Sequence, residues 1–244
     1  MALPRAILFD LDETLLSFGH RPALLADVVQ AFAVLFEPVA PARAAELLEA
    51  QFNIFWSDAE RHRLWRTRPL IEARRYICAK AFEDLAAEGA RGLTEALAHD
   101  FAERFHAHRE SQQRLFDGAH ETLDALTAAG VRLALVTNGT GEAQRDKIGR
   151  FDLEHRFAHI QIEGEHGFGK PEARAYEHAL QVLDLRPHET WMVGDNLDWE
   201  VAGPQKLGIF GIWHDPYGVG LPSDSPVRPD RIIRALPELL EPQW

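Results

Sequence analysis

Residues 6–14 read AILFDLDET, four apolar residues followed at once by two carboxylates two positions apart. A short, uninterrupted apolar run of this kind is typical of a buried strand. Two later runs have the same form, RLALVT at residues 132–137 and WMVGD at residues 191–195. In parallel α/β sheets, ligands bind beyond the carboxyl ends of the strands. We therefore expect the polar residues that end these three runs to converge in one crevice.

Helical patterns separate the apolar runs, at residues 119–129, 142–150 and 171–183. Alternation of strands and helices predicts an α/β fold with a doubly wound, mostly parallel, Rossmann-like sheet. Two further runs, residues 209–213 and 231–233, would extend that sheet.

Residues 17–113 interrupt the alternation, because they repeat apolar residues at intervals of three and four. Helices are predicted at residues 24–36, 42–56, 70–85 and 94–108. The sequence thus predicts an α/β catalytic core formed by residues 1–16 and 114–244. Residues 17–113 would form an inserted α-helical cap over the crevice.

Composition narrows the class of protein. The chain has 244 residues, of which 46% are hydrophobic and 26% charged, as in an ordinary globular protein. A balance of 26 basic against 38 acidic residues gives a net charge of −12, which argues against nucleic-acid or anionic-lipid partners. One cysteine allows no internal disulfide, and the apolar stretches are too short for a signal peptide or membrane span. We expect a cytoplasmic protein with no nucleic-acid or membrane partner; the oligomeric state is left open.

The two carboxylates after the first strand, Asp10 and Asp12, are ambiguous alone, since an Asp-x-Asp pair can simply be a solvated turn. Asp195 at another strand end changes this interpretation. Mg²⁺ binds to one or two carboxylates together with waters and phosphate oxygens. Asp10 and Asp195 together could therefore hold Mg²⁺.

Two glycine-containing segments could bind an anion. Residues 137–141, TNGTG, follow a predicted strand and open a helix, so their N–H groups could cradle a phosphate, although an ordinary turn has the same composition. Residues 164–171, GEHGFGKP, come close to a P-loop, but Pro171 stands where the Ser or Thr that binds magnesium is required. We expect Pro171 in the first turn of a helix, with Lys170 at the edge of the site.

In combination, these segments resemble the four motifs of the haloacid dehalogenase-like hydrolase superfamily. They occur in order as DLDET at residues 10–14, TNG at 137–139, Lys170, and Gly194-Asp195, and the resemblance covers essentially the whole chain. The resemblance implies a phosphatase with a helical first-site cap and Mg²⁺ as cofactor. The position of Glu200 departs from the family, which more often has aspartate there.

The resemblance also implies roles for individual residues. Asp10 would be the nucleophile, Asp12 the acid and base, Thr137 the phosphoryl-binding hydroxyl and Lys170 the stabiliser of charge. Phosphate would contact Thr137, Asn138 and Lys170. The metal ligands would be Asp10, Asp12 and Asp195, with Asn196 and Glu200 as auxiliary residues.

Elementary electrostatics supports these roles. A carboxylate that attacks a phosphate dianion at ~4 Å meets a repulsion of several kcal/mol at an effective dielectric near 20. Lys170 and Mg²⁺ would offset it. We expect hydrolysis of a small phosphorylated metabolite, a phosphomonoester, through an aspartyl-phosphate on Asp10, with a neutral Asp12 protonating the leaving alcohol.

Alternatives remain open from the sequence. A sugar-phosphate phosphotransferase would use the same core residues. A 2-haloacid dehalogenase needs neither magnesium nor an acid at position 12. A phospho-accepting switch or binding module also uses paired acids, Thr and Lys, but it would lack the helical insert.

Other residues receive structural interpretations. Eight basic or aromatic cap residues could hold the far end of an anionic substrate, although such a run is more often a solvated helix face; they are Arg61, His62, Arg63, Trp65, Arg66, Arg68, Arg74 and Arg75. Cys78 is predicted to be buried. The histidines are scattered, His106 and His108 lack zinc-helix spacing, and none is assigned to a metal.

Overall fold

The computed structural model describes residues 3–65 and 68–241, without the side chains of Ala59, His62 and Arg63. The chain divides into two compact units. The first comprises Met1–Ser17 and Arg114–Trp244, and the second comprises Phe18–Gln113. The role of the second unit as a cap over the first remains a prediction.

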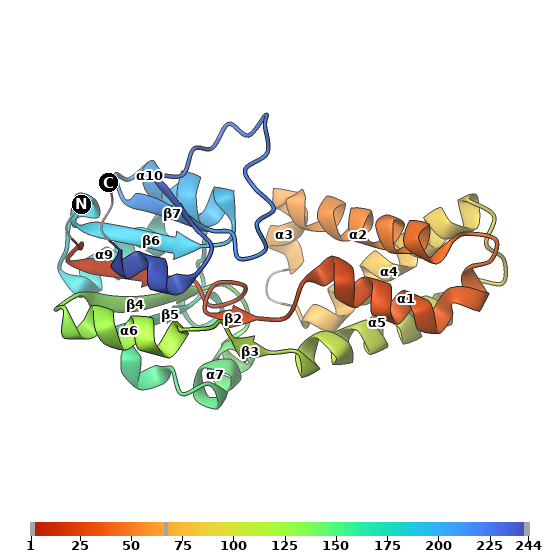
Figure 1. Cartoon of the computed structure of the whole chain (residues 1–244), viewed down its shortest axis with the longest axis horizontal. Helices are drawn as coiled ribbons and strands as arrows, with labels where there is room; N and C mark the ends of the chain where they lie inside the picture. Colours follow the sequence, from red (N-terminus) through yellow and green to blue (C-terminus); the bar gives the residue numbers. More distant parts are fainter. Residues whose placement is uncertain (1–2, 66–67, 242–244) are drawn as a thin grey trace. The chain divides into compact units, whose positions relative to one another are not determined.

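A six-stranded sheet forms the centre of the first unit, and its strand order is β5-β4-β1-β6-β7-β8 (Figure 1). Every neighbouring pair of these strands is parallel. The strands are β1 (Ala6–Phe9), β4 (Arg132–Thr137), β5 (His159–Ile162), β6 (Thr190–Gly194), β7 (Phe210–His214) and β8 (Arg231–Ile233). The α/β class expected from the sequence is confirmed, with β1 in the interior of the sheet between β4 and β6.

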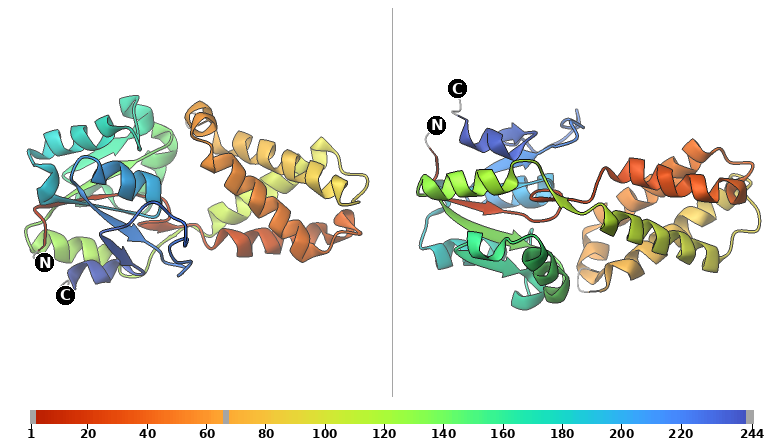
Figure 2. Two further views of the ribbon diagram at one scale, coloured as in Figure 1. Left: turned by 90° about the horizontal axis from the view of Figure 1, so that it is seen from above. Right: turned by 60° about the horizontal axis from the view of Figure 1, so that its bottom comes forward.

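Alternate residues of β1 pack on opposite faces of the sheet, as side chains in a strand must. Ile7 and Phe9 share an apolar cluster with α6 (Ala119–Ala128) and the 3₁₀ turn η4 (Leu236–Leu240), which lie on one face (Figure 2). Ala6 and Leu8 pack with α9 (Ala173–Leu183) on the other face. All four β1 residues are fully buried. Because burying one large apolar side chain stabilises a fold by about 1.5–3 kcal/mol, β1 holds the residue that follows it in a fixed place.

Shorter elements complete the first unit. A two-residue antiparallel ribbon, β2 (Leu16–Ser17) with β3 (Arg114–Leu115), forms where the chain leaves this unit and returns to it. The remaining elements are α7 (Gly141–Arg150), η1 (Glu154–Arg156), α8 (Glu163–His166), η2 (Pro187–Glu189), the π-helical segment η3 (Leu197–Ala202) and α10 (Gly203–Gln205).

The second unit is helical and has an apolar core of its own. Its helices are α1 (Arg21–Phe36), α2 (Pro41–Ser57), α3 (Ala59–Trp65), α4 (Leu70–Ala87) and α5 (Glu95–Ser111). The core includes Cys78, buried as predicted, and burial raises the pKa of its thiol to about 12. Among the described residues, no single helix has the length and apolar character needed to cross a membrane, although the bent pair α1 and α2 meets that test jointly.

The structure departs from the predicted elements at Pro171, at β5 and at α3, and in the shorter elements β2, β3 and α8. The helix expected from Pro171 begins at Ala173, so the placement of Pro171 in its first turn was wrong. Strand β5 was not predicted, because His159 and Gln161 interrupt its apolar pattern. Helix α3 was not predicted either.

Among the described basic residues of the predicted cap patch, Arg74 departs from a solvated helix face. Arg74 is buried and lies 3.8 Å from Glu110 of α5, while Arg75 donates to Glu103 of the same helix at 2.8 Å. The Arg61 guanidinium lies over the Phe55 ring. Arg66 and the side chains of His62 and Arg63 fall outside the described part of the structure.

Candidate active site

Asp10 is the first residue after β1, and its backbone N–H donates to the Val193 carbonyl at 3.0 Å. Phe9 pairs with Leu135 of β4 on one side and with Val193 of β6 on the other. The parallel register therefore brings Asp10 beside the carboxyl ends of β4 and β6. The side chain of Asp10 is also held by Thr14, whose hydroxyl donates to Oδ2 at 3.2 Å.

Lys170 lies between two carboxylates. Its Nζ is 2.5 Å from Asp10 Oδ1 and 2.7 Å from Glu200 Oε1, and the lysine is 1% exposed. Burial opposes the charge on Lys170, but attraction to the two carboxylates outweighs it and raises the lysine pKa. The site therefore holds a permanently charged ammonium against Asp10, away from bulk water.

The carboxylates of this trio are themselves hard to ionise. Burial raises the pKa of Asp10, with a further contribution from Asp12, while Lys170 acts in the opposite direction. Burial, together with the charge of Asp10, raises the pKa of Glu200 to about 7 against the pull of Lys170. One ammonium does not fully compensate so much negative charge, which leaves the site attractive to a further cation.

Glu200 reaches Lys170 because of the local backbone. It lies in the π-helical segment η3, and its Oε2 accepts from the Asn196 backbone N–H at 2.8 Å. A Cβ on Gly194 would lie 1.9 Å from the Glu200 Cγ, so only glycine leaves room for this side chain. The longer glutamate, which departs from the family pattern, is thus accommodated and contacts Lys170 directly.

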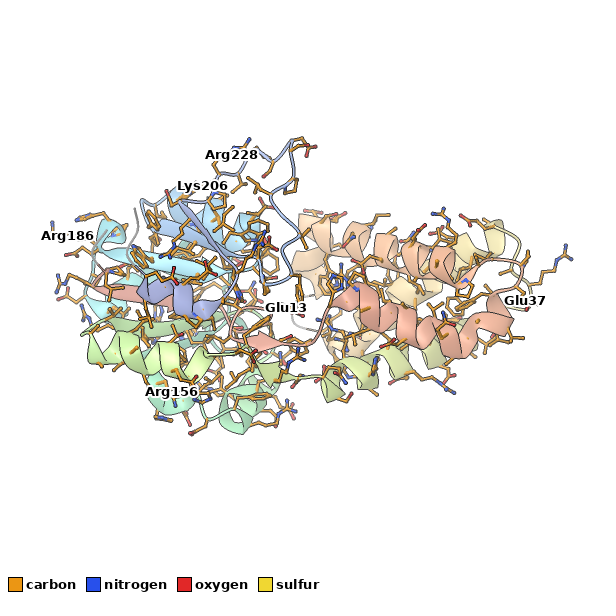
Figure 3. All side chains as sticks on the ribbon, in the orientation of Figure 1. Glu13, Glu37, Arg156, Arg186, Lys206 and Arg228 are labelled. Atoms are coloured by element: carbon orange, nitrogen blue, oxygen red, sulfur yellow. The ribbon has the colours of Figure 1, made fainter. Side chains whose placement is uncertain are left out.

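Asp195 directly follows β6, and the Trp213 indole donates to its backbone carbonyl at 2.7 Å. Its partly buried carboxylate makes no hydrogen bond or ion pair with any residue the structure describes. Burial, then the charges of Glu200, Asp10 and Glu13, raise its pKa well above the usual value. Glu13 lies on the loop after β1 (Figure 3).

The donor set around Asp195 suits Mg²⁺. The ion prefers a few carboxylate oxygens and keeps several waters. Asp10 and Asp195 offer such oxygens from neighbouring strand ends, and the Asp195 carboxylate has no protein cation of its own within ion-pair distance among the described residues. A divalent cation would favour the charged form of both carboxyls.

Gln144 connects Thr137 with Asp12. Its Nε2 lies 2.5 Å from Thr137 Oγ1, 3.0 Å from Asp12 Oδ2 and 2.9 Å from the Asn138 carbonyl. Thr137 is 2% exposed at the end of β4. Segment 137–141 does open a helix, as predicted, because Thr140 caps α7 by accepting from the Ala143 N–H at 3.4 Å.

The Asp12 carboxylate is paired with a cation. Lys147 Nζ lies 2.8 Å from each of its two oxygens. The Asp12 side chain faces Lys147 and Gln144 on α7, and the neutral carboxyl that the sequence led us to expect stays a prediction. Gln144 and Lys147 were both missed; their spacing of three on the helix after the TNGTG segment places them on one face, which was the available signal.

Asn138 organises the backbone at Lys170. Its Nδ2 donates to the Lys170 carbonyl at 2.7 Å, and its Oδ1 accepts from the Lys170 N–H at 2.9 Å. The Asn138 side-chain amide thus positions Lys170, and the expected contact of Asn138 with phosphate stays a prediction. Asn196 is likewise occupied, since its Oδ1 accepts from the N–H groups of Asp198 and Trp199.

The structure thus gathers the predicted residues of the first unit into two connected groups. Lys170 joins Asp10 to Glu200, and Gln144 joins Thr137 to Asp12. Asp195 belongs with the first group by its electrostatic coupling to Glu200 and Asp10. This arrangement of anionic ligand groups and one buried ammonium at the strand ends can bind a cation and an anion side by side.

Comparison with known proteins finds phosphatases and a nucleotidase among the similar sequences. The chain is 33% identical to the phosphoserine phosphatase of Thermus thermophilus, over 96% of this chain and 97% of that one. It is 27% identical to the pyrimidine 5'-nucleotidase PynA of Streptococcus pneumoniae, over 86% and 84% of the two chains. The fold resembles that of the HAD-hydrolase YfnB of Bacillus subtilis, solved with magnesium, with a TM-score of 0.67, 23% identity and 98% coverage of each chain.

A model of the haloacid dehalogenase-like hydrolase family matches residues 4–208. That stretch contains β1 through η3, and with them each of the site residues described above. Since the match spans most of the chain and both groups of site residues, this protein belongs to the haloacid dehalogenase-like hydrolases.

Proposed function

We propose that this protein is a Mg²⁺-dependent phosphatase that hydrolyses small phosphomonoesters, with Asp10 as the nucleophile. The observation that carries the proposal is the buried contact of Lys170 with Asp10, at 2.5 Å. A carboxylate attacking a phosphoryl group needs positive charge close by, and here an ammonium is held against the attacking group.

In the proposed first step, an Asp10 oxygen forms a bond to phosphorus while the bond from phosphorus to the substrate oxygen breaks. Thr14 and Lys170 orient the Asp10 carboxylate, and Lys170 offsets the charge that the phosphoryl oxygens bring. Thr137 presents its hydroxyl to a phosphoryl oxygen. Water then hydrolyses the aspartyl-phosphate and regenerates Asp10.

Asp12 would donate a proton to the leaving oxygen in the first step and take a proton from the attacking water in the second. In the structure its carboxylate is ion-paired with Lys147. Gln144 would hold Asp12 in place through the exchange.

Asp10 and Asp195 would hold the Mg²⁺, and Asp12, on the loop after β1, would be the third protein ligand. Bound there, the ion would neutralise phosphoryl oxygens and lower the repulsion of the incoming anion. Magnesium in the YfnB structure is consistent with this assignment. The Glu200 side chain would keep Lys170 directed at Asp10 rather than ligate the ion itself, given its contact at 2.7 Å.

Phosphoserine is the first substrate to test, because the phosphoserine phosphatase of T. thermophilus is similar over nearly the whole chain. A pyrimidine 5'-nucleotide is the second, given the similarity to PynA. We infer that the substrate is a small phosphorylated metabolite. We also infer that the protein acts in the cytoplasm, without a nucleic-acid or membrane partner.

The test measures phosphate release from p-nitrophenyl phosphate and from these candidates, with Mg²⁺ and with chelator. Asp10→Asn should remove Mg²⁺-dependent release, and Asp198→Asn, an exposed carboxylate in η3, should retain it. A phosphate adduct on the peptide containing Asp10 in quenched wild-type enzyme would support the covalent step. Release that survives in Asp10→Asn would refute it. Halide release from 2-chloropropionate without phosphate release would instead favour the dehalogenase alternative.

A further inference from the structure

Three histidines from separate elements of the first unit meet beside the edge strand β5. His159 opens β5, His166 ends α8, and His178 lies within α9. One ring nitrogen from each lies within 4.8 Å of those of the other two. None of the three belongs to the two groups that form the proposed catalytic site.

The hydrogen bonds of two rings define their tautomers. His166 Nδ1 lies 3.0 Å from the Ile162 carbonyl, which can only accept, so Nδ1 carries the proton and donates. His178 Nδ1 lies 2.8 Å from Gln161 Oε1, and the Gln161 Nε2 donates at 2.8 Å to the Ala175 carbonyl, which fixes the orientation of that amide. Both rings therefore present the lone pair of Nε2.

The third ring has an unsatisfied atom. His159 Nε2 is buried and has no hydrogen-bond partner within the described residues. A buried polar atom left unpaired is unfavourable, so such an atom in a well-packed region calls for an explanation. A ligand that accepts a lone pair from this nitrogen would remove the cost.

We propose that His159, His166 and His178 form a binding site for a divalent transition metal of the Zn²⁺ class. Three imidazoles with one open position are a known ligand set for Zn²⁺, and nitrogen ligands favour Zn²⁺, Co²⁺ or Ni²⁺ over Mg²⁺. Hydrogen bonds from Nδ1 to a carbonyl or amide oxygen are the usual support for histidines that ligate through Nε2.

The geometry requires a small closing movement. Ligand nitrogens of a tetrahedral zinc site stand about 3.3 Å apart, given Zn–N distances of about 2.0–2.1 Å. Rotation of the half-buried rings supplies the difference from the observed separation. The bound metal would tie β5, α8 and α9 together.

The experiment measures Zn²⁺ binding to the untagged, full-length protein by calorimetry, in excess Mg²⁺ to occupy the carboxylate site. Co²⁺ absorption serves as a second probe, because nitrogen-ligated tetrahedral Co²⁺ absorbs in the visible range. One Zn²⁺ per chain is expected. His159→Gln should weaken binding by on the order of 100-fold or more, and Gln161→Leu, which removes the acceptor for His178, by about 10- to 100-fold.

Matched controls use histidines elsewhere on the first unit. His155→Gln and His188→Gln alter exposed rings and should leave the affinity unchanged. Asp195→Asn should also leave it unchanged, which separates this site from the proposed catalytic metal site and from the fate of the proposed function. His166→Gln, on a half-buried ring at the end of a four-residue helix, replaces His159→Gln if the latter does not fold. Equal Zn²⁺ affinity in wild type and the folded histidine variant would overturn the proposal.

Discussion

Replacing Lys170 by methionine is expected to destabilise the first unit strongly. Methionine keeps the length of the side chain but leaves Asp10 and Glu200 facing each other without the ammonium that now lies 2.5 and 2.7 Å away. Removing one partner of a buried ion pair costs about 3–5 kcal/mol, because a charge remains buried without compensation. Lys170→Met should therefore lower the free energy of opening of this unit by that amount, in chelator so that no metal substitutes.

The cost should depend on pH with a defined sign. The Glu200 pKa is about 7 in the folded protein with Lys170 holding it down, so loss of Lys170 raises it further, and at low pH the carboxyl takes up a proton and partly relieves the cost. The cost is therefore expected to be larger at about pH 8 than near pH 5.

Native-state hydrogen exchange of peptides from β1 and β6 measures the opening free energy of this unit separately from the helical one. A loss of 3–5 kcal/mol would accelerate exchange through global opening by about two to three and a half orders of magnitude. Lys206→Met is the matched control, since it makes the same change at an exposed lysine of α10's C-cap (Figure 3) and should alter stability by less than about 0.5 kcal/mol. Equal exchange rates in the two variants at about pH 8 would refute the argument.

Three further predictions follow from the contacts of the site. Gly194→Ala places a Cβ 1.9 Å from the Glu200 Cγ and should lower the free energy of unfolding by about 1–3 kcal/mol or more, measured by heat or urea. Gly149→Ala, which has open space around it, should be neutral or stabilising. Similar losses of stability in both variants would contradict the close-packing argument. The Glu200 pKa is raised from 4.5 to about 7, so its contribution to stability is present below about pH 4.5 and is lost as the pH rises through about 7, a decline of about 3 kcal/mol. Urea titrations in chelator across this pH range should show a flatter decline in Glu200→Gln. An unchanged slope would count against the raised pKa. Gln144→Leu should lower kcat for p-nitrophenyl phosphate by about 10- to 100-fold with a smaller change in KM, because Asp12 and Thr137 lose their common donor. Gln181→Leu, on the exposed face of α9, should change neither kcat nor KM. Full activity in Gln144→Leu would show that Gln144 does not position Asp12 and Thr137.

The sequence predicted most of the sheet because its strands carry uninterrupted apolar runs. β1 and β8 were predicted at their observed bounds, and β4, β6 and β7 within one residue at each end. Edge strand β5 was missed, since HIQI alternates polar and apolar residues over only four positions. A strand at the edge of a sheet has fewer apolar neighbours on its outer side, so its own sequence carries less of the pattern.

Candidate site residues were predictable where a motif marks the end of a strand. Asp10, Thr137 and Asp195 follow from that rule, because the register of parallel strands places their carboxyl ends together. Side-chain partners were not predictable in the same way. Nothing local to Asp12 indicates that Lys147, 135 positions later, holds both of its oxygens.

Local sequence therefore determined the class of fold, the position along the chain of the strands that precede the candidate site residues, and the insertion of the helical segment. Backbone preference and apolar periodicity act over a few residues, so a short stretch of sequence is enough to specify them. Tertiary structure alone decided which charges meet. The pairing of Glu200 with Lys170 depends on a π-helical turn and on the space beside Gly194, and the meeting of three scattered histidines depends on how α8 and α9 pack against β5. Electrostatic coupling falls off with distance through space and is indifferent to separation along the chain, which is why only the folded structure could specify these contacts.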